Sequence, residues 1–166
     1  MLNDKTVAVV IPAFNEENQI CQVLEGIPAF VDRIIVVDDC STDNTAAIVL
    51  NVMSREDSKV PSLSIAKKTI EQSKYNRADV VLDDMVRKES EYFTPATIVN
   101  EQPDRDRIIF IKHLKNGGVG AAIASGYRWC LDHQIDCTAV MAGDGQMDPA
   151  ELESICKPVV FDGIDY

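Results

Sequence analysis

The sequence is poor in positive charge. It contains 16 lysine and arginine residues against 27 aspartate and glutamate residues, so its net charge at pH 7 is -11. An acidic chain repels nucleic acid and anionic lipid headgroups, so we expect neither as a general partner. A small polyanion can still bind to such a protein where a metal ion bridges the like charges.

Long apolar runs and paired cysteines are also missing. No run approaches the ~18 apolar residues needed to cross a membrane, so any membrane attachment would come from segments outside this chain. The first apolar run stops at Pro12, which is not typical of a signal peptide. The five cysteines include no CxxC pair, and Cys21, Cys130 and Cys156 fall within predicted helices. Buried, reduced thiols of a cytoplasmic protein are therefore expected.

The order of apolar runs predicts the fold class. The length of 166 residues suits one domain. Runs rich in Val and Ile predict buried parallel strands over 6–11, 33–37, 107–112 and 138–142. Helical patterns follow them, one capped by Asn15, one over about 45–53, one from the 117–120 glycines through Trp129, and one from Asp148-Pro149. The alternation predicts an α/β domain over 1–166, Rossmann-like, with a mostly parallel sheet flanked by helices.

One charged segment, 54–106, interrupts this alternation. We interpret it as a helical insertion packed beside the sheet, with helices over about 63–75 and 78–93. A solvated structural elaboration is the favoured interpretation, ahead of an acceptor- or partner-binding role.

Each predicted strand leads to polar or glycine residues, and ligands of open α/β sheets bind beyond the carboxyl ends of the strands. The first strand leads to Asn15 and Glu16, and the second to Asp38 and Asp39. These paired carboxylates can accept hydrogen bonds from a base or a ribose, or hold a cation, although one of them could instead cap the next helix. The third strand leads to the Gly117–Gly120 loop, where a helix N-terminus favours phosphate and where a plain tight turn explains the glycines about as well. The ends therefore predict one shared pocket.

The fourth strand leads to candidate metal ligands. Asp144 and Gln146 offer oxygen atoms at alternate positions, as Mg²⁺ or Mn²⁺ prefer. Asp148 precedes Pro149 and is better explained as a helix cap. His113 and His133 show no ligand-like spacing and are expected to be ordinary surface or structural residues.

Four motifs together resemble glycosyltransferase family 2, closest to its polyprenyl-phosphate sugar transferase-like branch. They are VAVVIPAFNEE, IIVVDDCSTDNT, KNGGVGAAIASGYR and VMAGDGQMDP, in the family's order. The resemblance implies a GT-A fold, a UDP- or GDP-sugar donor and inversion at the anomeric carbon. It implies a nucleotide site lined by Pro12, Ala13, Asn15 and Glu16, with Asp39 on the base or ribose and with Asn116 and Gly118 near the base, ribose or diphosphate; Asp38 is a further candidate there.

Asp144 matches the second aspartate of the family's metal-binding DxD motif, which makes it the candidate catalytic residue, and Gln146 matches the glutamine that often follows. The first aspartate of the motif is replaced by Ala142. The resemblance implies an acceptor that is a lipid phosphate or a saccharide, and an acceptor-side half beyond Tyr166, so that the chain is expected to be truncated. The protein is expected in the cytoplasm. If such a half follows, the full-length protein is expected at the cytoplasmic face of the membrane.

Other functions compete with this interpretation. The chain could bind a nucleotide sugar without transferring it. A Mg²⁺-dependent phosphoryl-transfer or receiver-like domain would need a further acid at the end of the first strand, where Pro12 stands. A sugar nucleotidyltransferase would need a glycine-rich basic loop there. The sequence leaves open whether the chain forms a homo-oligomer.

Overall fold

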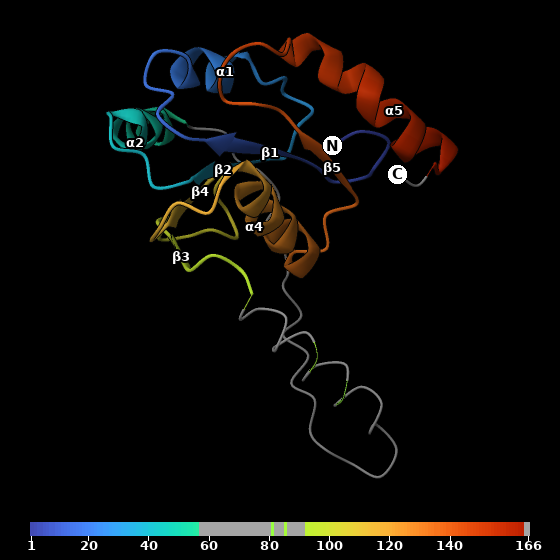
Figure 1. Cartoon of the computed structure of the whole chain (residues 1–166). Coiled ribbons are helices and arrows are strands. Elements are labelled where there is room, and N and C mark those ends of the chain that lie inside the picture. The colour runs from blue at the N-terminus through green and yellow to red at the C-terminus, as the bar shows by residue number, and fades with distance from the viewer. Residues whose placement is uncertain (57–80, 82–84, 86–91, 165–166) are drawn as a thin grey trace.

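The computed structural model describes residues 1–56, 81, 85 and 92–164, and its centre is a five-stranded sheet in the order β3-β4-β2-β1-β5. Four strands are parallel, whereas β3 pairs with β4 in the antiparallel sense. This confirms the predicted mostly parallel sheet (Figure 1). The strands are β1 (Val7–Ala13), β2 (Arg33–Asp38), β3 (Ala96–Ile98), β4 (Ile108–His113) and β5 (Cys137–Val140).

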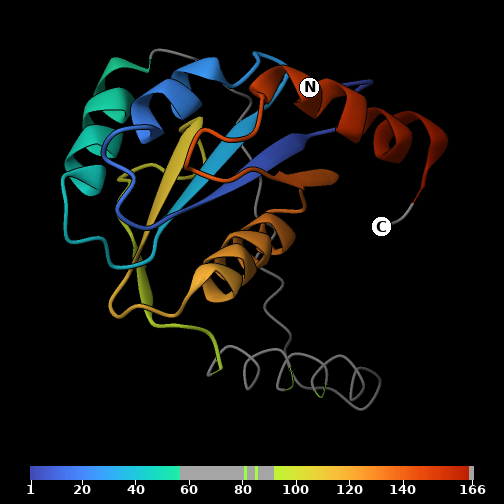
Figure 2. The same cartoon turned by 45° about the horizontal axis from the view of Figure 1, so that its top comes forward.

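Helices cover both faces of the sheet. In Figures 1 and 2, α4 lies on one face, and α1, α2 and α5 lie on the other. They are α1 (Ile20–Gly26), α2 (Thr45–Arg55), α4 (Val119–Asp132) and α5 (Leu152–Asp162), which follows a short 3₁₀ turn, η1 (Pro149–Glu151). Among the described residues, no helix combines the length and the apolar character that a membrane span requires.

The period of two along each strand sorts the core into two layers. In β2, Ile34 and Val36 pack with α1 and α2, whereas Ile35 and Val37 pack with Ala122 and Trp129 of α4. All of these β2 side chains are buried. Because successive side chains point to opposite faces, a strand covered on both sides must be apolar throughout.

Of two helix caps predicted from the sequence, one is confirmed and one is wrong. Asp148 accepts a hydrogen bond from the backbone N–H of Ala150, with Pro149 at the first position of η1, as predicted. The prediction that Asn15 caps α1 is wrong, because the residue before this helix is Gln19. The side chain of Asn15 instead accepts a hydrogen bond from the N–H of Thr42.

The segment 54–106, predicted to be a helical insertion, also contains a strand. Its first residues extend α2 to Arg55, and its last part contains β3, which adds an antiparallel edge strand that the sequence did not predict. Ala96, Thr97 and Ile98 are all exposed, so no apolar alternation marked them as a strand. The predicted helices over 63–75 and 78–93 lie almost entirely outside the described residues.

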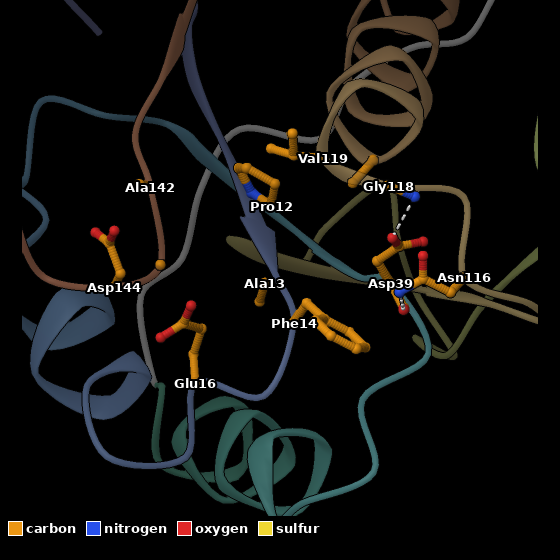
Figure 3. A pocket seen from close by; sticks show the side chains of 12 residues that line it. Pro12, Ala13, Phe14, Glu16, Asp39, Asn116, Gly118, Val119, Ala142 and Asp144 are labelled. Carbon is orange, nitrogen blue, oxygen red and sulfur yellow. Dashed lines mark hydrogen bonds between the residues drawn. The ribbon is translucent and has the colours of Figure 1, made fainter.

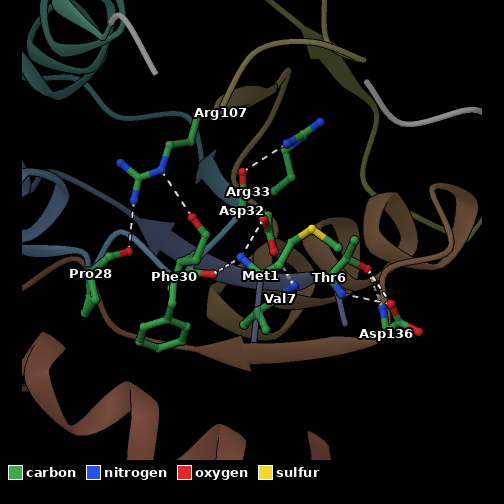
Figure 4. A network of polar contacts seen from close by, with 10 residues as sticks. Met1, Thr6, Val7, Pro28, Phe30, Asp32, Arg33, Arg107 and Asp136 are labelled. Atoms are coloured by element: carbon green, nitrogen blue, oxygen red, sulfur yellow. Dashed lines mark hydrogen bonds and ion pairs between the residues drawn. The ribbon is translucent and has the colours of Figure 1, made fainter. Parts of the chain in front are cut away.

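The end of the sheet opposite the strand carboxyl ends is held by polar contacts (Figure 4). The Asp136 carboxylate accepts hydrogen bonds from the N–H and hydroxyl groups of Thr6, at 2.9 and 2.8 Å. The Asp32 carboxylate accepts one from the N–H of Val7, and the Arg107 guanidinium donates to the carbonyl of Pro28. These contacts connect loops to strand starts.

The cysteines are free thiols, as expected. Cys130 and Cys156 are buried within α4 and α5, and Cys21 in α1 is half-buried. Burial raises the pKa of the Cys130 thiol to about 11, which keeps it protonated at neutral pH.

Candidate active site

The strand carboxyl ends surround one pocket of about 430 Å³ (Figure 3). The chain reaches it from the ends of β1, β2 and β5 and from the start of α4. The pocket therefore collects the parts of the sheet that the sequence predicted to meet. Its lining residues are Pro12, Ala13, Phe14, Glu16, Asp39, Asn116, Gly118, Val119, Ala122, Ala142, Gly143 and Asp144.

Asn15 lies outside this lining. Its backbone has a positive φ of 58°, and its N–H donates to the Ser41 hydroxyl at 3.0 Å. Its side-chain oxygen accepts from the Thr42 N–H at 2.8 Å. Asn15 therefore fastens the loop after β1 to the loop after β2, and positions Phe14 and Glu16 on either side of it at the pocket.

The adjacent carboxylates Asp38 and Asp39 point to different surroundings. Asp38 is fully buried, and its Oδ1 accepts a hydrogen bond from the Ser41 N–H at 2.9 Å. It continues the β2 face of Ile34 and Val36, and it is not among the pocket lining. Asp39 lies on the other face and lines the pocket. The two carboxylates therefore do not form one joint cation or nucleotide site.

Asp39 is held by three donors. Its Oδ1 accepts from Nδ1 of His113 at 2.6 Å and from the Gly117 N–H at 2.8 Å, and its Oδ2 accepts from the Gly118 N–H at 2.7 Å. Burial by itself would raise the pKa of Asp39, but the hydrogen bonds from Gly117, His113 and Gly118 outweigh it and lower the pKa below its ordinary value. Asp39 is therefore an ionised acceptor.

The glycine loop has a specific backbone requirement. Gly118 precedes α4 with a φ of 83°, which a glycine adopts without strain. This conformation brings its N–H onto Asp39, and the side-chain amide of Asn116 donates to the backbone carbonyl of Asp39 at 3.2 Å. The loop thus binds the end of β2 rather than presenting these two N–H groups to a ligand.

Glu16 and Asp144 form the acidic side of the pocket. Figure 3 shows both residues on the same side of the pocket, Glu16 from the loop after β1 and Asp144 from the loop after β5. Burial, and then repulsion from the carboxylates of Asp144 and Asp43, raise the pKa of Glu16. A cation between Glu16 and Asp144 would relieve this repulsion.

The second predicted metal ligand, Gln146, lies outside the lining. Its backbone N–H donates to Oδ1 of Asp144 at 3.0 Å and closes a tight turn that includes Gly145, with φ of 74°. Ala142, which stands at the first position of the DxD motif, does line the pocket. Two carboxylates at one side of a pocket suit a hard cation whose other ligands come from bound phosphate and water.

The sequence missed several residues of the site. The apolar lining of Phe14, Val119 and Ala122 carries no chemical signature in a sequence. His113, predicted to be ordinary, is buried and contacts Asp39 and Ser125. Its position two residues after Ile111 and four after Ile109, both packed on α4, is the signal that places it on this face.

The chain is similar to known proteins over part or most of its length. Residues 8–69 match the family model described as glycosyl transferase family 2. The chain is 27% identical over 164 residues to the UDP-N-acetylglucosamine--dolichyl-phosphate N-acetylglucosaminyltransferase of Methanococcus voltae, covering 98% of the chain and 51% of that protein.

Through residues 8–69 the chain is similar to glycosyltransferase family 2. The matched residues 8–69 contain all of β1 except Val7, together with β2 and the Asp38-Asp39 pair, and the mostly parallel sheet flanked by helices agrees with the GT-A fold. An uncharacterized protein of Methanocaldococcus jannaschii is 26% identical over 165 residues, which is 99% of the chain and 46% of that relative. The chain thus spans about half the length of both relatives.

Proposed function

We propose that this chain is the donor-binding part of an inverting glycosyltransferase that moves a sugar from a UDP- or GDP-sugar to a lipid phosphate. One observation carries the proposal: Pro12, Glu16, Asp39, Gly118 and Asp144, from four separate parts of the chain, line a single pocket. The name of the Methanococcus voltae relative, a UDP-N-acetylglucosamine--dolichyl-phosphate N-acetylglucosaminyltransferase, supports a UDP-sugar donor and a lipid phosphate acceptor.

The Asp39 side of the pocket suits the nucleoside. An ionised carboxylate offers about four acceptor positions, and protein donors occupy two on Oδ1 and one on Oδ2. The remaining position on Oδ2 can accept one N–H of a base or one hydroxyl of a ribose. Phe14 adds an aromatic ring, 47% exposed, at the same pocket.

The Glu16 and Asp144 side suits a diphosphate only together with a cation. Among the described residues that line the pocket, none is lysine or arginine. A diphosphate beside Glu16, Asp39 and Asp144 would therefore meet uncompensated negative charge. We infer that Asp144 and Glu16 hold Mg²⁺ or Mn²⁺, with Gln146 supporting Asp144 through its backbone N–H. When bound, such a cation neutralises charge that develops on the leaving diphosphate.

The transfer itself follows from the chemistry of the substrates. A phosphate oxygen of the acceptor bonds to the anomeric carbon as the bond from that carbon to the diphosphate oxygen breaks, and the electron pair leaves with the nucleoside diphosphate. Attack from the opposite face inverts the carbon. An anionic phosphate needs no general base, whereas a saccharide hydroxyl would need one.

Calorimetry tests the donor and the cation together. UDP-N-acetylglucosamine and GDP-mannose are titrated into the 166-residue chain, with and without Mn²⁺. We expect binding of one donor that Mn²⁺ strengthens, and that Asp144→Asn weakens about tenfold in the presence of Mn²⁺, equivalent to about 1.4 kcal/mol. Glu151→Gln removes one negative charge from an exposed side chain of η1 and should leave the affinity unchanged.

Two outcomes would overturn the proposal. If neither donor bound, the pocket would not be a nucleotide-sugar site. If Asp144→Asn and Glu151→Gln bound with equal affinity and Mn²⁺ had no effect, the cation would have no role. A transfer assay on the protein with its acceptor-side half, using polyprenyl phosphate, then distinguishes a transferase from a binding protein.

A further inference from the structure

A buried chain of hydrogen bonds runs from the pocket into the space between the sheet and α4. Nδ1 of His113 lies 2.6 Å from Oδ1 of Asp39, and Nε2 of His113 lies 2.9 Å from the Ser125 hydroxyl. The His113 side chain is fully buried, and Ser125 is only 9% exposed. The imidazole thus connects β4 with the end of β2 and with α4.

The surroundings of Asp39 determine which nitrogen of His113 carries the proton. The Gly117 and Gly118 N–H groups both donate into the Asp39 carboxylate, so this group is ionised and can only accept. Nδ1 must therefore be protonated. Nε2 then accepts from the Ser125 hydroxyl in the neutral ring, or donates to it in the imidazolium.

His113 also limits how Asp39 can turn. Together with Gly117 it fills both acceptor positions of Oδ1, while Gly118 fills one of the two on Oδ2. Without the His113 donor, Oδ1 would have a free position inside the protein, and rotation of the carboxylate would exchange the two oxygens at less cost. The one acceptor position left for the pocket is thus fixed by a residue that does not line the pocket.

We propose that His113 is a positioning residue for nucleotide binding, whose Nδ1–H orients the Asp39 carboxylate so that one Oδ2 acceptor position faces the donor pocket. The proposal rests on the proposed nucleotide-sugar site. It assigns His113 no contact with the substrate.

A matched pair of variants separates positioning from packing. In His113→Asn the amide nitrogen falls near the place of Nδ1 and retains the donor to Asp39. In His113→Gln the amide nitrogen falls near the place of Nε2 and retains a contact to Ser125 instead. Both replace the ring by a smaller amide, so both leave unfilled volume, and they differ in which hydrogen bond they retain, the one to Asp39 or the one to Ser125.

Binding of UDP and GDP is measured by calorimetry in the presence of Mn²⁺ for wild type and both variants. We expect His113→Gln to bind about tenfold more weakly than wild type, because a hydrogen bond to a charged group is lost, and His113→Asn to stay within about threefold. Thermal unfolding shows whether each variant folds.

The pH dependence of nucleotide affinity is a second measurement, and a loss of packing alone would not change it. The His113 imidazole faces the Asp39 carboxylate and helps to lower its pKa, and Glu16 and Asp144 are the other carboxylates that line the pocket. Losing its donor raises the pKa of Asp39, so the loss of affinity on acidification should begin at a higher pH in His113→Gln than in wild type. In His113→Asn this acid limb should stay near that of wild type.

Each other outcome has a defined meaning. If wild type binds neither nucleotide, the proposed function fails. If wild type binds and both variants bind equally, whether tightly or weakly, with an unmoved acid limb, the positioning role is wrong. Should His113→Gln not fold, ¹⁵N NMR of the wild-type imidazole decides: a proton on Nε2 alone contradicts the proposal, and a proton on Nδ1 that shifts on nucleotide addition supports it.

Discussion

At Gly126, α4 lies directly against Val10 of β1, and replacing this glycine tests how rigidly the helix is held. A Cβ at this position would lie 2.3 Å from Cγ1 and 2.9 Å from Cγ2 of Val10. Carbon atoms in contact are normally about 3.5–4.0 Å apart, so α4 or β1 would have to move by about 1 Å. Val10 is fully buried and β-branched, so its side chain cannot rotate away cheaply.

The expected magnitude comes from two opposing effects. Overpacking costs about 1–3 kcal/mol, whereas alanine in place of glycine stabilises a helix by about 0.5–1 kcal/mol. Gly120→Ala in the same helix is the control, because no heavy atom lies within 4 Å of its added Cβ and only the gain applies. The free energy of unfolding should therefore be about 1–3 kcal/mol lower in Gly126→Ala than in Gly120→Ala.

Urea unfolding of both variants, monitored by circular dichroism, measures this difference. We also expect Gly126→Ala to weaken nucleotide binding, because a displaced α4 carries the Gly118 N–H away from Asp39. Equal stability of the two variants would show that the helix is not tightly seated against β1. The explanation of the Asp39 geometry by a fixed α4 would then be refuted.

Two further predictions concern pH. The pKa of Glu16 is raised in the folded state, so the metal-free protein loses stability as the pH rises from the ordinary pKa of a glutamate through the raised pKa. Glu16→Gln should therefore be more stable than wild type at pH 7 and equally stable in acid. Its stability should also be insensitive to Mn²⁺. The opposite sign applies to Asp136, whose pKa is lowered, first by the hydrogen bond from the Thr6 N–H and also by that from its hydroxyl. Asp136→Asn should be less stable at neutral pH, and the difference should vanish as pH falls through the folded-state pKa. Thermal unfolding between pH 3 and 8 checks both, and a pH-independent difference would contradict either.

The parallel core of the fold was predictable from the sequence because its strands are covered on both faces. The best covered of them, β1, β2 and β4, are rich in Val and Ile, and all four predicted strands occur within one or two residues of their predicted limits. β3 shows the opposite case. It is short and exposed, and hydrogen bonds to β4 rather than burial hold it, so apolar pattern could not reveal it. The prediction that Asn15 caps α1 was wrong for a related reason, because its side chain forms a hydrogen bond with Thr42 in a loop that is distant in sequence.

The convergence of the strand ends on one pocket was also predictable. Which of two adjacent residues lines that pocket depends on the face of the sheet to which each side chain points. Asp38 and Asp39 were both candidates because they share a strand end. The alternation of Ile34 and Val36 against Ile35 and Val37 sends the first carboxylate into the α1 and α2 layer and the second to the α4 layer.

The same alternation, continued along β4 through Ile109 and Ile111, places His113 opposite Asp39 in the α4 layer. A polar residue that ends an apolar row on this face must find a partner, because a buried polar group without a hydrogen bond costs free energy. Asp39 is that partner, and its own charge is balanced by the glycine N–H groups that begin α4. The orientation of the pocket carboxylate is therefore a consequence of how the sheet and α4 pack, which is why substitutions at His113 or Gly126, outside the pocket, should change what the pocket binds.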